Sequence, residues 1–534
     1  MTPLLETFAS GSARGEGLFG LSGLQSAGPF FVTLHALSTV SGVSGSGQIG
    51  IDSSNNITKS WGYTTTATYN IVVKMSPSGT TTNVLHVLNS SNQEEAPGQG
   101  YITTGGTFFN ATFMGGTWVD NNNGGTTYPV VRAWRSIGGS ASYYTGIDPN
   151  LGAGSQTYSQ GFYTDSSLNI YMTDGIINTG TYGTYNQLTT LAIMKASSLG
   201  TIQAFGGTEF QWANNITITG SSSTTPSGSQ NAIGYVNKNS NGNIDVVSNS
   251  LFYYNDTSVY GGYRGRTLIS GGVSQSYAWN HYQINPSTGA VVFVKSQQPA
   301  SNSNYALEYQ GISSISDLNG NIILFSGTSG STITASSYNL NTQTINWTIS
   351  GSNGGTAVPD AVGNWYLGNW TPTGGTGNLT KVDKNGNIVW SNRIVGNTLS
   401  VKIDALAIDS LNNLIVSGIV NTSSSLQPAS ILLKLPISGS TGSGSWSLSP
   451  GDGYTRTITY TSANVSSTTS SLSALTTAAY TTATGSNVLL NQSNSILPTN
   501  YLPNGGNYGT IYTATSLPAS VGAGTSFTGT NTSF

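Results

Sequence analysis

A short phrase that returns along the chain constrains its fold more than any other feature. In each copy an Asp is followed four residues later by an Asn, then by an apolar or aromatic run, and then by a Gly; the copies begin at Asp52, Asp165, Asp317, Asp360 and Asp409. Asp and Asn bond to nearby backbone groups and form tight turns. The runs that follow are short and rich in β-branched and aromatic residues, which favours strands over helices. Self-similarity of this kind indicates a repeat architecture.

A second phrase follows the first and consists of a strand, a polar turn and another strand. Clear copies are Val72–Gly79, Ile193–Gly200 and Thr380–Gly386. Asn-Gly and Ser-Gly between apolar runs are strong hairpin signals. Each unit therefore contains two hairpin turns and four strands, and a four-stranded unit of about 40–50 residues is the size of a β-propeller blade.

The number of units is less certain than their type. First phrases begin near 52, 165, 211, 317, 360 and 409, and weaker units are expected at 108–134 and 267–289. Counted in this way the chain has eight units, but the Asp-to-Asn turn is lost in the two weaker ones. Seven blades and eight blades both remain open.

One stretch resembles a known repeat family. Lys381–Trp390 followed by Ile403–Gly418 is similar to the seven-bladed β-propeller (SBBP-type) repeat, in which a lysine, a glycine turn and a tryptophan precede an aspartate, an asparagine and a strand that ends in glycine. The resemblance implies an all-β propeller of four-stranded blades. It implies no single activity, because propellers carry many unrelated functions.

The pattern divides the chain into three parts. Residues 1–40 precede the first phrase and form an expected attachment arm; 41–446 form the expected propeller; and 447–534 form a Ser/Thr/Asn-rich extension. The arm either docks onto another subunit or supplies the strand that closes the ring. The extension is expected to be an extended arm or a small β region, with disorder as the alternative.

Composition excludes several classes of function. Charged residues make up only 7% of the chain and the net charge is −3, against about 25% charged residues in ordinary domains. The 16 basic residues are scattered, whereas nucleic-acid binding needs them clustered. No apolar run approaches the roughly 20 residues that span a bilayer. The chain has no cysteine, so neither disulfides nor a thiolate nucleophile contribute.

The histidines and the recurrent aspartates are better explained by structural or surface roles than by catalysis. His35, His86 and His281 lack neighbours at metal-ligand spacing and are expected on the surface or in the pore. One Asp per unit at the same turn indicates a structural role, because a glycosidase needs two carboxylates in one pocket. We therefore expect no metal, no cofactor and no enzymatic activity.

Aromatic residues give the one candidate contact site. Tyr253, Tyr254, Tyr260, Tyr263 and Trp279 lie in the most irregular unit. Tyr and Trp on loops suit contact with a glycan or a protein. These five residues are the predicted ligand or receptor contacts.

The functional prediction combines the fold with the composition. Met1–Glu6 has no basic region and no continuous apolar stretch, so no secretion signal is expected, yet the composition resembles that of phage tail fibres and capsid-surface proteins. The sequence thus predicts a phage virion surface protein, of tail-fibre, receptor-binding or capsid-decoration type. It would be present in multiple copies, bound to other virion proteins through its termini and to a host glycan or protein. The alternatives are a secreted or cell-surface binding propeller and a polysaccharide-acting enzyme.

Overall fold

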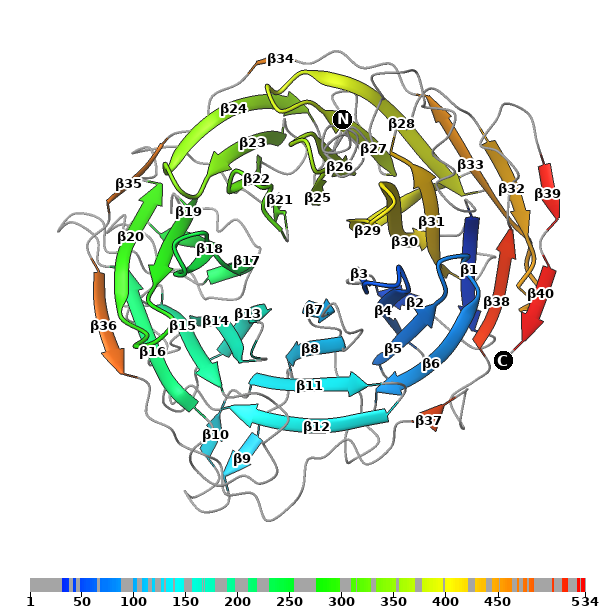
Figure 1. Ribbon diagram of the computed structural model, residues 1–534. Coiled ribbons are helices and arrows are strands. Elements are labelled where there is room, and N and C mark those ends of the chain that lie inside the picture. Colours follow the sequence, from blue (N-terminus) through cyan, green and yellow to red (C-terminus); the bar gives the residue numbers. More distant parts are fainter. Residues whose placement is uncertain are drawn as a thin grey trace, which may run out of the picture.

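A computed structural model of the 534-residue chain describes forty strands between Phe31 and Ser533, together with the short turns beside them. Residues 1–30, 178–189, 197–209, 219–229, 254–274, 298–308, 485–501 and several shorter connections lie outside the described part. Within the described residues the strands stand in radial sheets around one axis (Figure 1). None of the described segments is a helix long and apolar enough to cross a membrane.

Seven antiparallel sheets form the blades of the described ring, numbered here in chain order. Blade 1 contains β2 (Gly42–Ser44), β3 (Ile49–Ile51), β4 (Ile57–Thr64), β5 (Thr68–Met75) and β6 (Thr81–Val87). Blade 2 contains β7 (Gln99–Ile102), β8 (Phe108–Phe113), β11 (Val131–Ile137) and β12 (Ser140–Ile147), with the hairpin β9 (Trp118–Asp120) and β10 (Thr126–Tyr128) inserted after β8. Blade 3 contains β13 (Gln156–Thr164), β14 (Ile170–Ile177), β15 (Thr190–Ala196) and β16 (Phe210–Ile218).

The remaining blades follow the same order from the axis outward. Blade 4 contains β17 (Gln230–Lys238), β18 (Ile244–Tyr253), β19 (Gln275–Ile284) and β20 (Val291–Gln297). Blade 5 contains β21 (Tyr309–Ile312), β22 (Asn321–Gly327), β23 (Ile333–Asn339) and β24 (Thr344–Gly351). Blade 6 contains β25 (Thr356–Pro359), β26 (Trp365–Gly368), β27 (Asn378–Val382) and β28 (Ile388–Gly396). Blade 7 contains β29 (Leu399–Ile408), β30 (Asn413–Val420), β31 (Ala429–Pro436) and β1 (Phe31–Leu37).

This architecture confirms the predicted all-β propeller, and of the two blade counts left open by the sequence, seven and eight, the described ring has seven. The phrase near 211 is β16, the outermost of the four strands that build blade 3, and the expected unit at 267–289 belongs to blade 4. In the sequence the phrase near 211 counts as a separate unit because the second and the fourth strand of a blade both follow a turn and have the same sequence pattern.

The recurrent Asp holds the first turn of five blades by accepting hydrogen bonds. In blade 5 Asp317 Oδ1 accepts from the backbone N–H groups of Asn319 and Asn321 at 2.9 and 2.8 Å, and Oδ2 accepts from Asn321 Nδ2 at 2.8 Å. The same three contacts recur in the first turns at Asp52, Asp165, Asp360 and Asp409 and in the third-to-fourth turn of blade 6 at Asp383. One carboxylate thus satisfies the turn's free donors, which explains why Asp recurs at this turn position.

Aromatic side chains dock one blade onto a turn glycine of the next. Trp347 of blade 5 donates its Nε1–H to the Lys384 carbonyl at 3.1 Å and covers Gly386, whose φ is +89°. Trp212 of blade 3 does the same with the Pro286 carbonyl and Gly289 in blade 4. A β-carbon at either glycine would overlap the indole ring. Trp212 and Trp347 therefore pack between blades.

The N-terminal strand closes the ring. β1 pairs antiparallel with β31, with Leu34 opposite Ile431, and so becomes the fourth strand of the last blade. Phe31 at its start covers Gly79 of blade 1, which repeats the aromatic-on-glycine contact of the other blades. The two ends of the blade series are therefore joined by a strand and by packing, as the ring-closing alternative for the N-terminal part predicted.

The C-terminal part encircles the blades instead of standing apart (Figure 1). Its strands add to the outer edges of blades 6, 5, 4, 3, 1 and 7 in turn, opposite to the order of the blades. These strands are β33 (Arg456–Ser462), β34 (Thr468–Thr469), β35 (Leu475–Thr477), β36 (Tyr480–Thr484), β37 (Leu502–Pro503) and β38 (Ile511–Ser516). We call this run the belt.

The last strands of the C-terminal part pair next to the start of the belt. β32 (Gly444–Leu448) pairs with β33 at the start of the belt, and β39 (Ser526–Thr528) pairs parallel with β32 at its end. β40 (Thr530–Ser533) pairs with β38. Added outer strands cover sheet edges that would otherwise be open to pairing with other chains.

Candidate functional site

The two faces of the ring differ in how the strands are joined. First-to-second and third-to-fourth connections join strand ends on one face, which we call the turn face; many of them are short turns such as 52–56, 239–243 and 360–364, and 197–209 in blade 3 is longer. Second-to-third connections and those between blades lie on the opposite face, and they include 178–189, 219–229, 254–274 and 298–308. We call this the loop face. Binding residues gather on loops that a rigid scaffold positions, so the loop face is the candidate site.

Four long connections between blades 3 and 5, namely 178–189, 219–229, 254–274 and 298–308, have a distinctive composition. They contain the tyrosines Tyr182, Tyr185, Tyr254, Tyr260, Tyr263 and Tyr305 and four charged residues, Asp256, Arg264, Arg266 and Glu308, whereas 88–98 between blades 1 and 2 carries Glu94 and Glu95. The remainder of the four is mostly Gly, Ser, Thr and Asn. This composition supplies aromatic side chains together with neutral hydrogen-bonding groups.

The predicted contact residues divide between this face and the core. Tyr253 ends β18 at the loop face, and Tyr254, Tyr260 and Tyr263 belong to the connection 254–274, outside the described residues. Trp279 is a correction: it is 1% exposed and donates its Nε1–H to Ser326 Oγ at 2.7 Å, which ties blade 4 to blade 5. Its side chain packs between blades and cannot meet a ligand at the surface.

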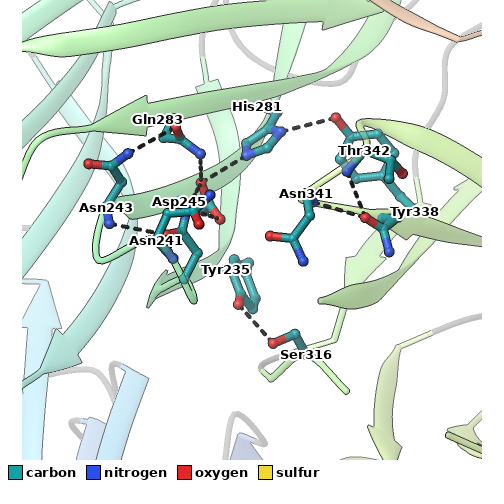
Figure 2. Close-up of polar contacts among 12 residues, drawn as sticks. Tyr235, Asn241, Asn243, Asp245, His281, Gln283, Ser316, Tyr338, Asn341 and Thr342 are labelled. Carbon is teal, nitrogen blue, oxygen red and sulfur yellow. Dashed lines mark hydrogen bonds and ion pairs between the residues drawn. The ribbon is translucent and has the colours of Figure 1, made fainter. Parts of the chain in front are cut away.

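A cluster of polar side chains that the sequence analysis did not find joins the same two blades (Figure 2). At its centre Asp245 on β18 accepts hydrogen bonds from Asn239 Nδ2 at 3.1 Å and Gln283 Nε2 at 3.0 Å. His281 Nε2 lies 3.2 Å from Asp245 Oδ1, and His281 Nδ1 lies 3.0 Å from the hydroxyl of Tyr338 in blade 5. The tautomer that satisfies both neighbours has its proton on Nε2 and accepts the tyrosine proton at Nδ1.

The Asp245–His281–Tyr338 chain is closed to solvent, which decides its role. All three side chains are 0% exposed. Burial, with the charge of Asp245 as a second cause, raises the pKa of Tyr338 well above its ordinary value. The hydroxyl therefore stays protonated and serves as a donor, and since no ligand can reach it, the chain holds blade 4 against blade 5.

Comparison of the first turns of the blades in the sequence could have revealed this cluster. The first turn of blade 4 carries Asn239 where blades 1, 3, 5, 6 and 7 carry Asp, and the carboxylate appears instead at Asp245, six residues later. Blades 3 and 6 have Tyr171 and Tyr366 at that position, and the other three have Thr58, Ile323 and Ile415. An acid at a strand position that is uncharged in these blades marks a buried polar contact.

A second group of buried charges lies where blade 7 meets blade 1. Lys59 of β4 crosses to blade 7 and donates from Nζ to the Ile431 carbonyl at 2.6 Å. In the opposite direction Lys434 Nζ reaches the Pro77 carbonyl at 3.2 Å. Further cross-contacts join Ser410 to Asn55 Oδ1 at 2.9 Å and His35 to Thr81 Oγ1 at 3.3 Å. These contacts seal the junction that the N-terminal strand closes.

Burial shifts the pKa values of three side chains at this junction, Lys59, Asp404 and His35. It lowers the pKa of Lys59 to about 7, a shift that the nearby Asp404 partly opposes. Burial likewise raises the pKa of Asp404, against the lowering effect of Lys402 and Lys59. It lowers the pKa of His35 to about 3, with the charge of Lys59 as a second cause. Two of the three predicted surface or pore histidines, His35 and His281, are therefore buried instead.

Stability should rise between pH 7 and pH 9 because of Lys59. In this range the unfolded chain holds the lysine proton, with a pKa near 10.5, while the folded chain releases it at about 7; the folded state then gains stability as pH increases. We expect urea unfolding midpoints at pH 7 and pH 9 to show this gain, on the order of 2 kcal/mol, and Lys59→Met to remove it. The same pH response in both proteins would contradict the assignment.

Catalytic chemistry of the glycosidase type is not assembled from the inner strands. Of the strands nearest the axis only β29 carries a carboxylate, Asp404, whereas glycoside hydrolysis needs two. The described residues also include no group of three or more His, Cys, Asp or Glu that could hold a metal ion. Further carboxylates on the loop face come from the connections, with Asp256 and Glu308 among them.

Comparison with known proteins finds similarity in structure only. No family model matches the chain and no curated protein matches it. A Dyadobacter fermentans protein of unknown function matches with a TM-score of 0.40 and 10% identity, over 75% of this chain and 98% of its own. A Penicillium chrysogenum α-L-arabinanase complexed with arabinobiose matches with 0.38 and 11%, over 76% and 98%. Streptococcus pneumoniae NanB sialidase matches with 0.33 and 8%, over 77% and 95%.

These comparisons bear on two predictions: the absence of enzymatic activity and the resemblance to the SBBP-type repeat. The prediction that the chain is not an enzyme is contradicted, because the similar structures include glycoside hydrolases; catalysis is not excluded by the fold or by the composition. Likenesses with TM-scores of 0.40 and below assign no activity to this chain. The resemblance to the SBBP-type repeat stays a resemblance, since no family model matches.

Proposed function

We propose that this propeller recognises a neutral polysaccharide on its loop face. The observation that carries the proposal is the composition of the long connections between blades 3 and 5: they join strand ends on the loop face, contain six tyrosines and carry four charged residues, whereas Asp-held turns recur on the opposite face. Sugar rings offer apolar faces to tyrosine and hydroxyls to Asn, Ser and Thr. A nearly neutral surface suits an uncharged polymer better than a polyanion, which would need clustered basic residues.

Replacing Tyr260 and Tyr263 by alanine should weaken polysaccharide binding by about tenfold or more, because aromatic contacts carry a large share of binding energy. Binding is measured by affinity electrophoresis against a panel of neutral polysaccharides, with arabinan included. The control is Lys384→Ala, an exposed residue of the turn face, which should bind as the unmodified protein does. Equal binding by all three proteins, with unfolding midpoints unchanged, would sink the assignment of the site.

The first question is whether the protein cleaves the polysaccharide that it binds. Cleavage is measured as the release of reducing ends from that polysaccharide. Asp256→Asn and Glu308→Gln remove the two carboxylates of the four long connections. Loss of release with binding retained would place the protein among polysaccharide-acting enzymes. Binding without release in the unmodified protein would make it a recognition module.

The predicted place on a phage particle, and attachment there to other virion proteins, remain proposals to which the comparisons add no support. Mass spectrometry of purified particles tests them directly. The protein's presence in stoichiometric amounts would support them, and its absence would reject them.

A further inference from the structure

The large apolar side chains that the described surface exposes gather on one side of the molecule. They lie in or next to the turns of four consecutive blades: Val292 in blade 4, Ile315 and Leu318 in blade 5, Val362 and Val389 in blade 6, and Leu411 in blade 7. All of these turns belong to the turn face, opposite the proposed polysaccharide site. Single exposed apolar residues need no explanation, but a gathering of them marks an interaction surface.

Comparison among the repeated turns shows that these residues are not needed for folding. The turn tips of blades 5, 6 and 7 carry Leu318, Val362 and Leu411, which are 86%, 51% and 47% exposed. The equivalent turns of blades 1 and 4 carry only polar residues and glycine at their tips, with Ser53, Ser54 and Asn55 in blade 1 and Ser240 and Asn241 in blade 4. The turn of blade 3 includes Leu168, which lies outside the described residues. The same Asx-held turn forms with either kind of residue, so the aliphatic tips serve something other than the turn.

The three aliphatic tips lie on neighbouring turns. A β-carbon at Gly363, the residue after Val362, would lie 3.7 Å from Asp317 Oδ2, the residue before Leu318. Tyr366 of blade 6 donates to the Ile437 carbonyl at the end of blade 7, at 3.1 Å. Ser410, the residue before Leu411, bonds to Asn55 in the first turn of blade 1. Leu318, Val362 and Leu411 thus form one arc, which we call the apolar arc, and polar tips adjoin it in blade 1.

The chain enters the propeller beside this arc. β1 is the fourth strand of blade 7 and begins at Phe31, opposite Lys434 near the end of β31; it therefore starts at the turn face. Phe31 covers Gly79 in the turn between the third and fourth strands of blade 1. The first described strand consequently begins at the turn face, next to the junction of blades 7 and 1 and in the same blade as Leu411.

The segment before β1 matches the arc in chemistry and in length. Residues 17–25 read Gly-Leu-Phe-Gly-Leu-Ser-Gly-Leu-Gln, with Leu18, Phe19, Leu21 and Leu24 spaced by Gly and Ser and with no charge. A chain spans about 3.3 Å per extended residue, so the stretch from Leu24 to Phe31 can reach about 23 Å. Burying such leucines against the arc removes apolar surface from water on both sides.

We propose that residues 17–25 of the same chain bind the apolar arc and cover it. The N-terminal segment would then fasten the turn face across the ring junction and leave the loop face free for its ligand. The proposal does not depend on the nature of that ligand. A second copy of the chain seated on the arc is the competing arrangement, and the experiment separates the two.

The absence of native cysteine allows a direct test in the full chain. Leu411→Cys places the only thiol in the arc, and Ser54→Cys places it at the equivalent polar tip of blade 1. Each is combined with an arm variant in which Leu18, Phe19, Leu21 and Leu24 are all changed to Ser, and the rate of maleimide labelling is measured at several protein concentrations. We expect the arm variant to raise the rate at position 411 by about tenfold or more, at every concentration, and to leave position 54 unchanged.

Two outcomes overturn the proposal. An equal labelling rate at position 411 with and without the arm substitutions shows that the segment does not cover the arc. Protection that disappears on dilution, together with a dimer in sedimentation analysis, assigns the arc to a second copy. Unfolding midpoints measured on the same samples show whether each variant is folded, and little change is expected from the cysteine substitutions because positions 411 and 54 lie in turns outside the paired strands.

Discussion

Replacing Asp409 by alanine should destabilise the propeller by about 3–5 kcal/mol, the cost of leaving a buried charge without its partner. Asp409 Oδ2 lies 3.1 Å from Lys434 Nζ, and both side chains are 1% exposed. The same carboxylate accepts the backbone N–H groups of Leu411 and Asn413, so the substitution loosens the turn as well. Urea unfolding at neutral pH measures the loss, as a fall in the midpoint.

The turn at Asp383 serves as a control that separates the contribution of the buried ion pair from that of the turn hydrogen bonds. Asp383 makes the same three turn hydrogen bonds, from Asn385 and Asn387, but lies at the surface, so Asp383→Ala should cost only about 1 kcal/mol. Adding Lys434→Met to Asp409→Ala should recover part of the loss, because the stranded charge is then gone. Equal losses from the two alanine substitutions would show that the buried ion pair contributes nothing beyond the turn.

Replacing Gly377 by alanine should cost about 3 kcal/mol or more, through backbone strain and overlap together. Gly377 has a φ of +78°, and an added β-carbon would lie 2.6 Å from the Val401 carbonyl oxygen and closer still to that of Ile394. Its own carbonyl accepts the Ile394 N–H at 2.8 Å, which holds it beneath the connection from blade 6 to blade 7. Relaxation would have to move backbone in both blades.

Gly453 provides the control for backbone strain alone. It has a φ of +88° and nothing within 4 Å of an added β-carbon. Gly453→Ala should therefore cost only about 1 kcal/mol, the price of a left-handed conformation for a residue with a side chain. Thermal and urea unfolding of the two variants side by side measure the difference. Similar losses in both would mean that the two blades are not packed around Gly377 as described.

The sequence predicts the blade interior well because the Asp-held turns are local. An Asp that bonds to the N–H groups two and four residues ahead needs no distant partner, so Asp52, Asp165 and Asp317 could be recognised from the chain alone. The blade count was harder, since the phrase near 211 begins the fourth strand of a blade and reads like a second strand. Only pairing between strands distinguishes these positions.

The belt and the buried clusters were beyond sequence reasoning for physical reasons. Outer strands such as β34 and β36 are short and rich in Ser and Thr, so they lack the apolar alternation that identifies a strand. Asp245 and His281 meet because β18 and β19 pair across the connection 254–274, and register across such a connection cannot be read from spacing. Trp279 was assigned to a ligand site because its neighbours in sequence lie in that connection.

A density map of the protein at side-chain resolution tests the central claim most directly. We predict seven radial blades, each built on four or more strands, with Phe31–Leu37 paired to Ala429–Pro436 as the strand that closes the ring, and C-terminal strands added along the outer edges. Eight blades, an open stack of sheets, or a C-terminal part that folds away from the ring would contradict it.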